Sequence, residues 1–323
     1  MNAEIYEGMD GWLFLQGGSN KVGTLYDRNS RLLPDSKLGR WKRLIEYRAH
    51  KLEALGIQYV HVNVPEKQTI YDNKFRDPPI VDWRLSPARR LGEMMRDSTH
   101  SDVWLDLTEP LRAARDEDDL YLKTDTHWSA AGCFRAYKAI CRRLGIVPEA
   151  DLLNTRTCLD TGAYLDIGSK LEPPVAEAFK IYDFIRNARR TQADAIARYL
   201  DTMPDKPVMH VGSQVAFRND SPSAASKRVM IFGDSYASQR GNALTGMLAE
   251  TVREVEFIWS SNLDWAHISR VRPDILIYEL AERFMTRLPN DRLSLRWTLA
   301  RRSLRAEWLA RKARWEMQGK RPG

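Results

Sequence analysis

The chain has 323 residues, of which 43% are hydrophobic and 29% charged, as in a soluble globular protein with a large core. No run approaches the roughly 18 apolar residues of a membrane span, and residues 1–7 lack the basic and apolar regions of a signal peptide, so the sequence as written predicts a cytoplasmic protein. The net charge of +7 is concentrated in residues 292–321, which hold ten Lys/Arg and two acids. The rest of the chain has a net charge near −1, which argues against nucleic-acid binding by the main domain.

The three cysteines, Cys133, Cys141 and Cys158, lack the paired spacing of redox or zinc motifs. The six histidines are scattered, and those other than His127 have no partners at metal-ligand spacing. The sequence also has no phosphate-binding glycine loop. We therefore expect no disulfide framework, no metal site and no nucleotide cofactor.

The first part of the chain predicts strands and a helix in alternation. Residues 8–15 alternate aromatic and aliphatic side chains, which favours a strand or hairpin arm. Helical apolar spacing follows over 36–55, and then a nearly continuous apolar strand over 57–64, of the kind buried in a parallel sheet. Lys67 comes just after this strand, where ligands bind in such sheets. It is a candidate site residue, although a solvated loop position is the simpler interpretation.

A second unit repeats the order. The pattern predicts a helix over 87–96, a strand over 103–107, a loop over 121–128 and a helix over 129–144. Alternating strands and helices indicate an α/β protein with a doubly wound sheet. We expect a flavodoxin-like three-layer fold, with about five mostly parallel strands and helices on both faces.

Residues 146–226 break this alternation, because they are rich in proline and include a polar stretch over 219–226. We expect a small irregular or β insertion here, with strands near 179–184 and 208–217. The segment 164–171 is expected to be an ordered loop near a site.

The sequence Gly233-Asp-Ser follows a short apolar strand over 229–232. Ser235 falls where a helix is expected to begin and to run through Leu248. At a strand's carboxyl end, a serine meets free backbone N–H groups that suit a developing oxyanion. The alternative is that Asp234 or Ser235 only caps the helix.

Two further strands are predicted, over 255–259 and 274–280, and each is followed by polar residues. These strands complete a catalytic domain over 1–290, with its insertion at 146–226. Residues 291–323 are expected to form a separate basic amphipathic helix.

That helix is predicted over 293–317. Its apolar seam consists of Trp297, Leu304, Trp308 and Trp315, and arginines surround it. Packing on the domain or on a partner is the interpretation we favour. The alternative is docking on an anionic membrane or polymer, as basic helices with tryptophan can do.

Asp125 and His127 are two residues apart, so in an extended segment their side chains would point to one side. The carboxylate could then accept the imidazole Nδ1–H and leave Nε2 as a general base. Ser235 would need such a base, because a neutral serine is a poor nucleophile. An isolated Asp-x-His pair can also bind a metal or be purely structural.

The turn around Ser235 lacks the second glycine of the Gly-x-Ser-x-Gly elbow, which argues against an ordinary α/β-hydrolase. The remaining class is that of Gly-Asp-Ser esterases and acyltransferases. In ordinary members the Asp-x-x-His block follows the Gly-Asp-Ser block, whereas here Asp-Thr-His precedes it.

This order resembles the alginate O-acetyltransferase family of the AlgX/AlgJ type, whose members have an SGNH-hydrolase-like domain. The similar motifs are Gly-Trp-Leu-Phe-Leu at 11–15, Val-Pro-Glu-Lys at 64–67, Thr-Asp-Thr-His-Trp at 124–128, residues 162–171, Ile-Phe-Gly-Asp-Ser at 231–235, and Glu-Arg at 282–283. Family members are bacterial and periplasmic, behind a leader or anchor that this sequence does not show.

The resemblance implies a nucleophile at Ser235, a base at His127 and an orienting acid at Asp125. Asn262 is our candidate for a side-chain oxyanion donor. The residues expected at the substrate edge, or in support of the triad, are Tyr236, Trp128, Lys67 and Arg283.

The function implied is O-acetylation of a polysaccharide or other glycan hydroxyl, with an acetyl donor as co-substrate and no cofactor. A membrane-bound acetyl-carrier protein is the expected kind of donor partner. The alternatives are a carbohydrate esterase with the same triad and a non-catalytic glycan-binding or assembly protein.

Overall fold

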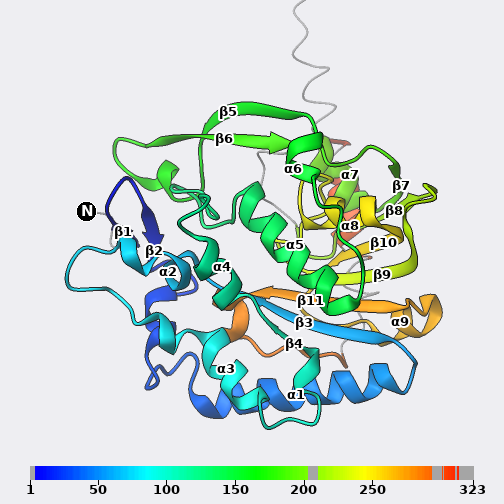
Figure 1. Ribbon diagram of the computed structural model, residues 1–323, viewed down its shortest axis with the longest axis horizontal. Coiled ribbons are helices and arrows are strands. Elements are labelled where there is room, and N and C mark those ends of the chain that lie inside the picture. Colours follow the sequence, from blue (N-terminus) through cyan, green and yellow to red (C-terminus); the bar gives the residue numbers. More distant parts are fainter. Residues whose placement is uncertain (1–3, 203–209, 293–299, 301, 310, 313–323) are drawn as a thin grey trace, which may run out of the picture.

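The computed structural model describes residues 4–202, 210–292, 300, 302–309 and 311–312 (Figure 1). Its centre is a seven-stranded sheet with the order β4–β3–β11–β9–β10–β8–β7. The strands are β4 (Trp104–Asp106), β3 (Gln58–Val64), β11 (Ile275–Ala281), β9 (Ala225–Gly233), β10 (Val252–Trp259), β8 (Gln214–Asn219) and β7 (Ala188–Ala193). The first five are parallel to one another, and β8 and β7 are antiparallel additions at one edge.

The sheet therefore has seven strands, two more than the five that the sequence predicted. The five parallel strands were all predicted, but the insertion contributes two more strands. β7 has the sequence Ala-Arg-Arg-Thr-Gln-Ala, and its middle residues are exposed. It therefore lacks the alternation of apolar and polar residues from which a strand is predicted. β8 overlaps the strand predicted near 208–217, but it pairs with β10 and so belongs to the main sheet.

Two small antiparallel sheets lie outside the main one. One pairs β1 (Ile5–Glu7) with β2 (Leu13–Leu15), and the other pairs β5 (Cys158–Tyr164) with β6 (Ala176–Tyr182). In Figure 1 the β5–β6 ribbon lies beyond α5, on the side of the sheet opposite α1. The insertion thus forms both an extension of the sheet and a separate ribbon.

Helices cover both faces of the sheet, as predicted. α1 (Asp35–Glu53) and α3 (Pro87–Met95) lie on one side, and α5 (Ala130–Leu144) lies on the other, next to α8 (Leu244–Thr251) (Figure 1). The other helices are α2 (Lys67–Ile70), α4 (Thr108–Ala114), α6 (Leu152–Thr155), α7 (Ala195–Thr202) and α9 (Trp265–Val271). The 3-10 turns are η1 (Val22–Tyr26), η2 (Asp72–Lys74), η3 (Trp83–Leu85), η4 (Ser101–Val103), η5 (Gly168–Lys170) and η6 (Glu282–Thr286).

The central strands are buried on both faces, which explains their continuous apolar sequences. All seven residues of β11 and the last six of β3 are buried. His61 of β3 lies inside this layer, where Tyr59 and Asn63 are hydrogen-bonded to its two ring nitrogens at 3.0 and 3.1 Å. Burial lowers the pKa of His61, so it is a neutral core residue.

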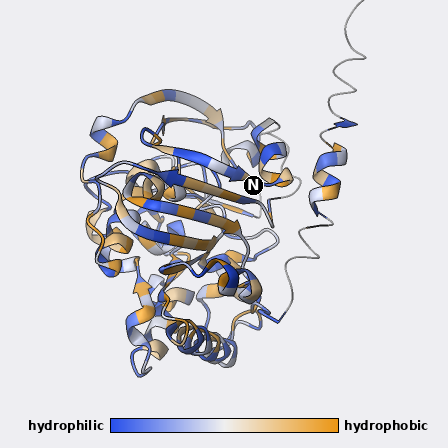
Figure 2. Cartoon of the chain, turned by 90° about the vertical axis from the view of Figure 1, so that its right-hand side faces the viewer, coloured by the Kyte–Doolittle hydropathy of each residue, from blue (hydrophilic) through white to orange (hydrophobic). Residues whose placement is uncertain are grey.

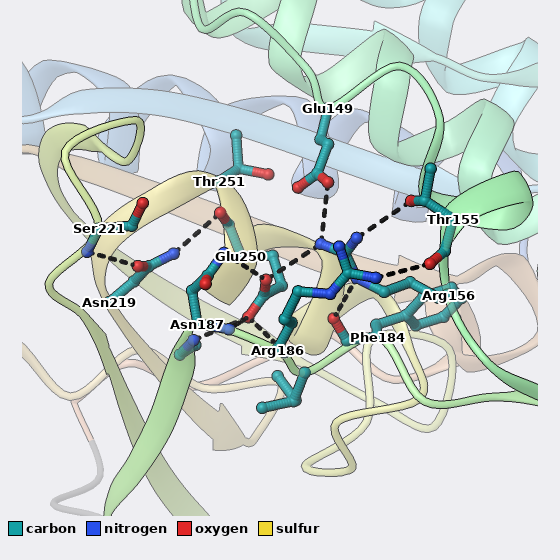
Figure 3. A network of polar contacts seen from close by, with 12 residues as sticks. Glu149, Thr155, Arg156, Phe184, Arg186, Asn187, Asn219, Ser221, Glu250 and Thr251 are labelled. Carbon is teal, nitrogen blue, oxygen red and sulfur yellow. Dashed lines mark hydrogen bonds and ion pairs between the residues drawn. The ribbon is translucent and has the colours of Figure 1, made fainter.

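Figure 3 shows how the insertion is attached to the core through Glu250 of α8. One carboxylate oxygen accepts the backbone N–H groups of Arg186, Asn187 and Ala188 at 2.8–2.9 Å. The other accepts from the Arg156 guanidinium at 3.1 Å. Because both Arg156 and Glu250 are buried, these bonds join the segment before β7 firmly to α8.

The described part of the C-terminal helix, residues 302–309, packs on α7. Ala306 is fully buried there, whereas Leu304 and Trp308 are 67% and 59% exposed. Leu304 and Trp308 therefore do not pack on the described part of the domain, and docking of this seam on a partner or a membrane stays a prediction. Figure 2 shows this segment with both hydrophilic and hydrophobic residues. Trp297 and Trp315 lie outside the described residues.

None of the helices in the described ranges combines the length and the apolar character that a membrane crossing requires.

Candidate active site

Asp125, His127 and Ser235 come together from two loops. The Ser235 Oγ lies 2.7 Å from His127 Nε2, and the Asp125 Oδ1 lies 2.6 Å from His127 Nδ1. With a proton on Nδ1, the imidazole donates to Asp125 and accepts from the serine hydroxyl. The arrangement is that of a serine nucleophile, its base and an orienting acid.

Ser235 lies two residues beyond the end of β9, but the helix expected to begin at this serine does not form there. α8 begins only at Leu244, and residues 234–243 form turns. Two buried carboxyls take up the N–H groups of the turn: Asp234 accepts from Tyr236, and Glu279 of β11 accepts from Asp234 and Ala237. The expected helix start is thus absent at Ser235, and the serine is not a helix cap.

Gly233 allows the Glu279 carboxyl to approach this turn, because a Cβ at position 233 would lie 2.8 Å from Glu279 Oε2. Asp234 also accepts the N–H of Ala281 through its other oxygen. Its carboxyl therefore joins the turn to the end of β11. Burial raises the pKa of Glu279, and the neighbouring Asp234 carboxyl raises it further.

The loop that carries His127 forms a bend, in contrast to the extended segment that was expected. Asp125 Oδ1 accepts the backbone N–H of His127 at 2.8 Å as well as its Nδ1–H, so one oxygen fixes both backbone and ring. Ser129 then caps α5 by accepting the N–H of Gly132.

Lys67, which precedes this loop in the sequence, and Glu177, which follows it, both bind the loop backbone. The Lys67 ammonium donates to the carbonyls of Leu122, Lys123 and Asp125 at 2.8, 2.7 and 2.6 Å. Glu177 of β6 accepts the N–H groups of Lys123 and Thr124. Lys67 is buried and does not line the cavity, so it is neither a solvated loop residue nor at the substrate edge, and it supports the base loop instead.

Asp166 provides a further carboxylate beside the base. It accepts the N–H and the hydroxyl of Thr126 at 2.8 and 2.5 Å. Its neighbours Ile167 and Gly168 donate their N–H groups to Thr124. The expectation of an ordered loop near the site over 164–171 is confirmed, although Asp166 itself was not singled out.

Tyr236 and Arg283 connect the two loops. The Tyr236 hydroxyl donates to the Thr126 carbonyl at 2.6 Å, and it accepts from Arg283 at 2.7 Å. Arg283 in turn pairs with Glu66 at 2.7 Å, and all three side chains are buried. Tyr236 and Arg283 therefore fix the positions of the nucleophile turn and the base loop relative to each other.

The charges around His127 favour its protonation. Burial opposes the charged imidazolium, but the hydrogen bond and charge of Asp125, with the charge of Asp166, outweigh it and raise the pKa of His127. Burial also opposes ionisation of Asp125, but its bonds to His127 hold the pKa of that carboxyl below its usual range. Burial lowers the pKa of Lys67 to about 7.

Ser235 and His127 line an open cavity of about 960 Å³. Trp128 and Tyr236 also line it, and their rings meet edge to face with centroids 5.1 Å apart. Residues 177–182, all of them in β6, form part of the wall, so the insertion contributes to the site. Trp128 thus lines the cavity, which is one of the two positions expected for it.

Asn262 is placed differently from the expectation. It is not among the described residues that line the cavity, and its side-chain oxygen accepts the N–H of Asn290. It is therefore not placed as the oxyanion donor. Within the described part of the chain the N–H of Ser235 donates to no protein acceptor, so this group can face an oxyanion. Gln239, which the sequence did not single out, is a buried amide on the cavity wall.

Asp125, His127 and Asp166 each offer a possible ligand atom within 4.8 Å of the others. Both imidazole nitrogens already have partners, however, and Asp166 accepts two hydrogen bonds from Thr126. In a metal centre, one nitrogen of the histidine would be directed at the ion. The three side chains are instead arranged as members of a hydrogen-bonded network.

Comparisons with known proteins agree with this architecture. The chain is similar to the O-acetyltransferase domain of Pseudomonas putida AlgJ, with 16% identity, a TM-score of 0.56, and 93% and 98% of the two chains covered. It is also similar to Bacillus cereus PatB1, with 14% identity, a TM-score of 0.60 and coverage of 87% and 96%. A third similar structure is that of Pseudomonas aeruginosa AlgX, with 14% identity and a TM-score of 0.54. The match covers 88% of this chain and 63% of that one.

No curated protein matches the chain. The profile of one family, described as the SGNH hydrolase-like domain of acetyltransferase AlgX, matches residues 5–263 and therefore most of the sequence. The chain belongs to the SGNH-hydrolase-like acetyltransferase family of AlgX.

Proposed function

We propose that the chain is a serine-dependent O-acetyltransferase that acetylates hydroxyl groups of a polysaccharide or oligosaccharide. The observation that carries this proposal is the continuous hydrogen-bonded line from Asp125 through His127 to Ser235 at the wall of an open cavity. Membership of an acetyltransferase family supports the choice of the acetyl group.

In the first half of the reaction, His127 Nε2 takes the hydroxyl proton of Ser235 as Oγ attacks the acetyl carbonyl. The N–H of Ser235 stabilises the tetrahedral oxyanion. The imidazolium then gives its proton to the leaving group of the donor, and the acetyl group remains as an ester on Ser235. Asp125 stabilises the imidazolium and fixes the tautomer.

In the second half, neutral His127 takes the proton of a sugar hydroxyl, whose oxygen attacks the serine ester. Collapse of the second tetrahedral intermediate releases the acetylated sugar, and the imidazolium returns the proton to Ser235 Oγ. The enzyme is regenerated, and one acetyl group has moved from donor to sugar. The donor is a co-substrate, and an acetyl-carrying membrane protein is the partner we propose for it.

The proposal is tested by mixing the protein with 4-nitrophenyl acetate and an oligosaccharide, and following both nitrophenol release and acetylated sugar by mass spectrometry. We expect both products with the wild type and neither with Ser235→Ala. Ser223→Ala, at an exposed serine away from the cavity, is the matched control. Turnover that is unchanged in Ser235→Ala would overturn the mechanism, and release without sugar acetylation would identify an esterase.

A further inference from the structure

We propose that His210 and Trp259 form a stacking platform that binds a pyranose ring of the acceptor next to Ser235. This inference rests on the proposed function, because it names the place where the accepting sugar lies. The two rings are stacked, with centroids 4.8 Å apart and planes 23° from parallel. Both residues line the same cavity as Ser235 and His127.

The position of Trp259 is fixed relative to the nucleophile turn. Trp259 ends β10, and it lies opposite Gly233, the last residue of β9, in the parallel register. Ser260 then donates its N–H to the Gly233 carbonyl at 3.1 Å. Because Gly233 is two residues before Ser235, the indole and the nucleophile are carried by adjacent strand ends. This arrangement is rigid enough to orient a bound sugar.

The backbone of Trp259 also holds the segment that carries His210. Gly212 donates its N–H to the Trp259 carbonyl at 2.7 Å, and Trp259 donates its own N–H to Ser213 at 2.9 Å. Ser213 in turn donates to the His210 carbonyl at 3.0 Å. Gly212 has a φ of 100°, a conformation that suits glycine and makes this close turn possible. These bonds bring the imidazole over the indole.

The platform has the chemistry of a sugar site. Aromatic faces offer apolar surface to the C–H face of a pyranose, and adjoining polar groups bind its hydroxyls. The His210 imidazole lines the cavity, and burial, together with the nearby Arg240 charge, lowers the pKa of His210, so the ring that a sugar meets is neutral.

Arg240 adds a donor at the same end of the cavity, and its side chain is exposed. The catalytic steps derived from Asp125, His127 and Ser235 use neither His210 nor Trp259. A ring held on the platform would bring a hydroxyl toward the acetylated serine and displace water from it. Both effects favour transfer over hydrolysis.

The test separates acceptor binding from formation of the acyl-enzyme. Cellohexaose and hexagalacturonate serve as a neutral and an acidic pyranose chain. Their binding is measured by calorimetry on Ser235→Ala protein, alone and combined with His210→Ala, Trp259→Ala or Trp259→Phe. Acyl-enzyme formation from 4-nitrophenyl acetate is measured on the same three platform variants with Ser235 present. Tyr47→Ala, at an exposed aromatic residue of α1 that does not line the cavity, is the control.

We expect Trp259→Ala to weaken binding of at least one of the two oligosaccharides by about tenfold or more, with a smaller loss in His210→Ala and the least in Trp259→Phe. Acyl-enzyme formation should stay within about twofold of the wild type. Equal binding by all variants, or no binding of either oligosaccharide to Ser235→Ala protein, would overturn the platform. Failure of wild-type protein to form an acyl-enzyme would instead refute the proposed function.

Discussion

The Tyr236 hydroxyl donates to the Thr126 carbonyl at 2.6 Å, and this bond joins the turn that carries Ser235 to the loop that carries His127. The two residues are 110 positions apart in the sequence. Each is the immediate neighbour of a catalytic candidate. The distance between nucleophile and base therefore depends on a contact that involves neither of them.

Tyr236→Phe removes this bond and leaves a buried Arg283 N–H without its partner. We expect kcat to fall on the order of 10- to 100-fold, because a small displacement of a nucleophile from its base has effects of this size. KM should change less. The free energy of unfolding should decrease by about 1–3 kcal/mol, as for an unsatisfied buried donor. Steady-state kinetics and urea denaturation measure both, and an unchanged kcat would contradict this role.

Asp166→Asn tests the electrostatics of the base. His127 must be neutral to accept a proton, so activity rises with pH through the pKa of His127. Asp125 and Asp166 raise this pKa, which places the wild-type rise above the pH expected for an unperturbed histidine. Removing the Asp166 charge lowers the pKa of His127, so the rise in kcat/KM should move to lower pH.

The matched control for this prediction is Asp160→Asn, an exposed carboxylate of β5 that is in the same insertion. Its pH profile should superimpose on that of the wild type. A shift of the Asp166→Asn profile to higher pH would show that the sign of this interaction is wrong.

Lys67→Met removes the donor for three carbonyls of the base loop while keeping much of the side-chain volume. We expect kcat to fall by at least about tenfold, since the loop loses the contact that orders it. Hydrogen exchange at residues 122–127 should become faster. Lys227→Met, at an exposed position of β9, should leave both measurements unchanged. Normal exchange in Lys67→Met would contradict the role of this lysine in holding the loop.

Glu250→Gln tests the attachment of the insertion shown in Figure 3. The Arg156 guanidinium would lose its buried carboxylate and keep only Glu149, which is more exposed. We expect a loss of about 3 kcal/mol in the free energy of unfolding. Glu254→Gln, which breaks more exposed ion pairs on β10, should cost less than about 1 kcal/mol. Equal losses in the two variants would contradict this account.

The sequence predicted the parallel strands and the three candidate catalytic residues because their signals are local. β3 and β11 are continuous apolar runs, as strands buried on both faces must be. Asp125, His127 and Ser235 lie in short motifs at predicted element ends. Parallel strands bring such ends to one edge of the sheet.

The predictions that were wrong concern positions where the local sequence pattern does not decide the structure. The helix expected at Ser235 does not form there, because the chain leaves the single turn after Asp234 at Ser238, whose φ of 56° lies in the left-handed region. Asn262 resembled an oxyanion donor in position, but it is not among the described residues that line the cavity with Ser235. The Glu66–Arg283 pair joins residues 217 positions apart, and no local spacing could reveal it.

The measurement that tests the central claim most directly is the site of acetylation after rapid quenching with acid. The protein is mixed with 4-nitrophenyl acetate, digested and analysed by mass spectrometry. We predict one acetyl group on the peptide that contains Ser235, absent from Ser235→Ala and strongly slowed in His127→Ala. Acetylation of a different residue at the rate of turnover, with the Ser235 peptide unmodified, would contradict the account.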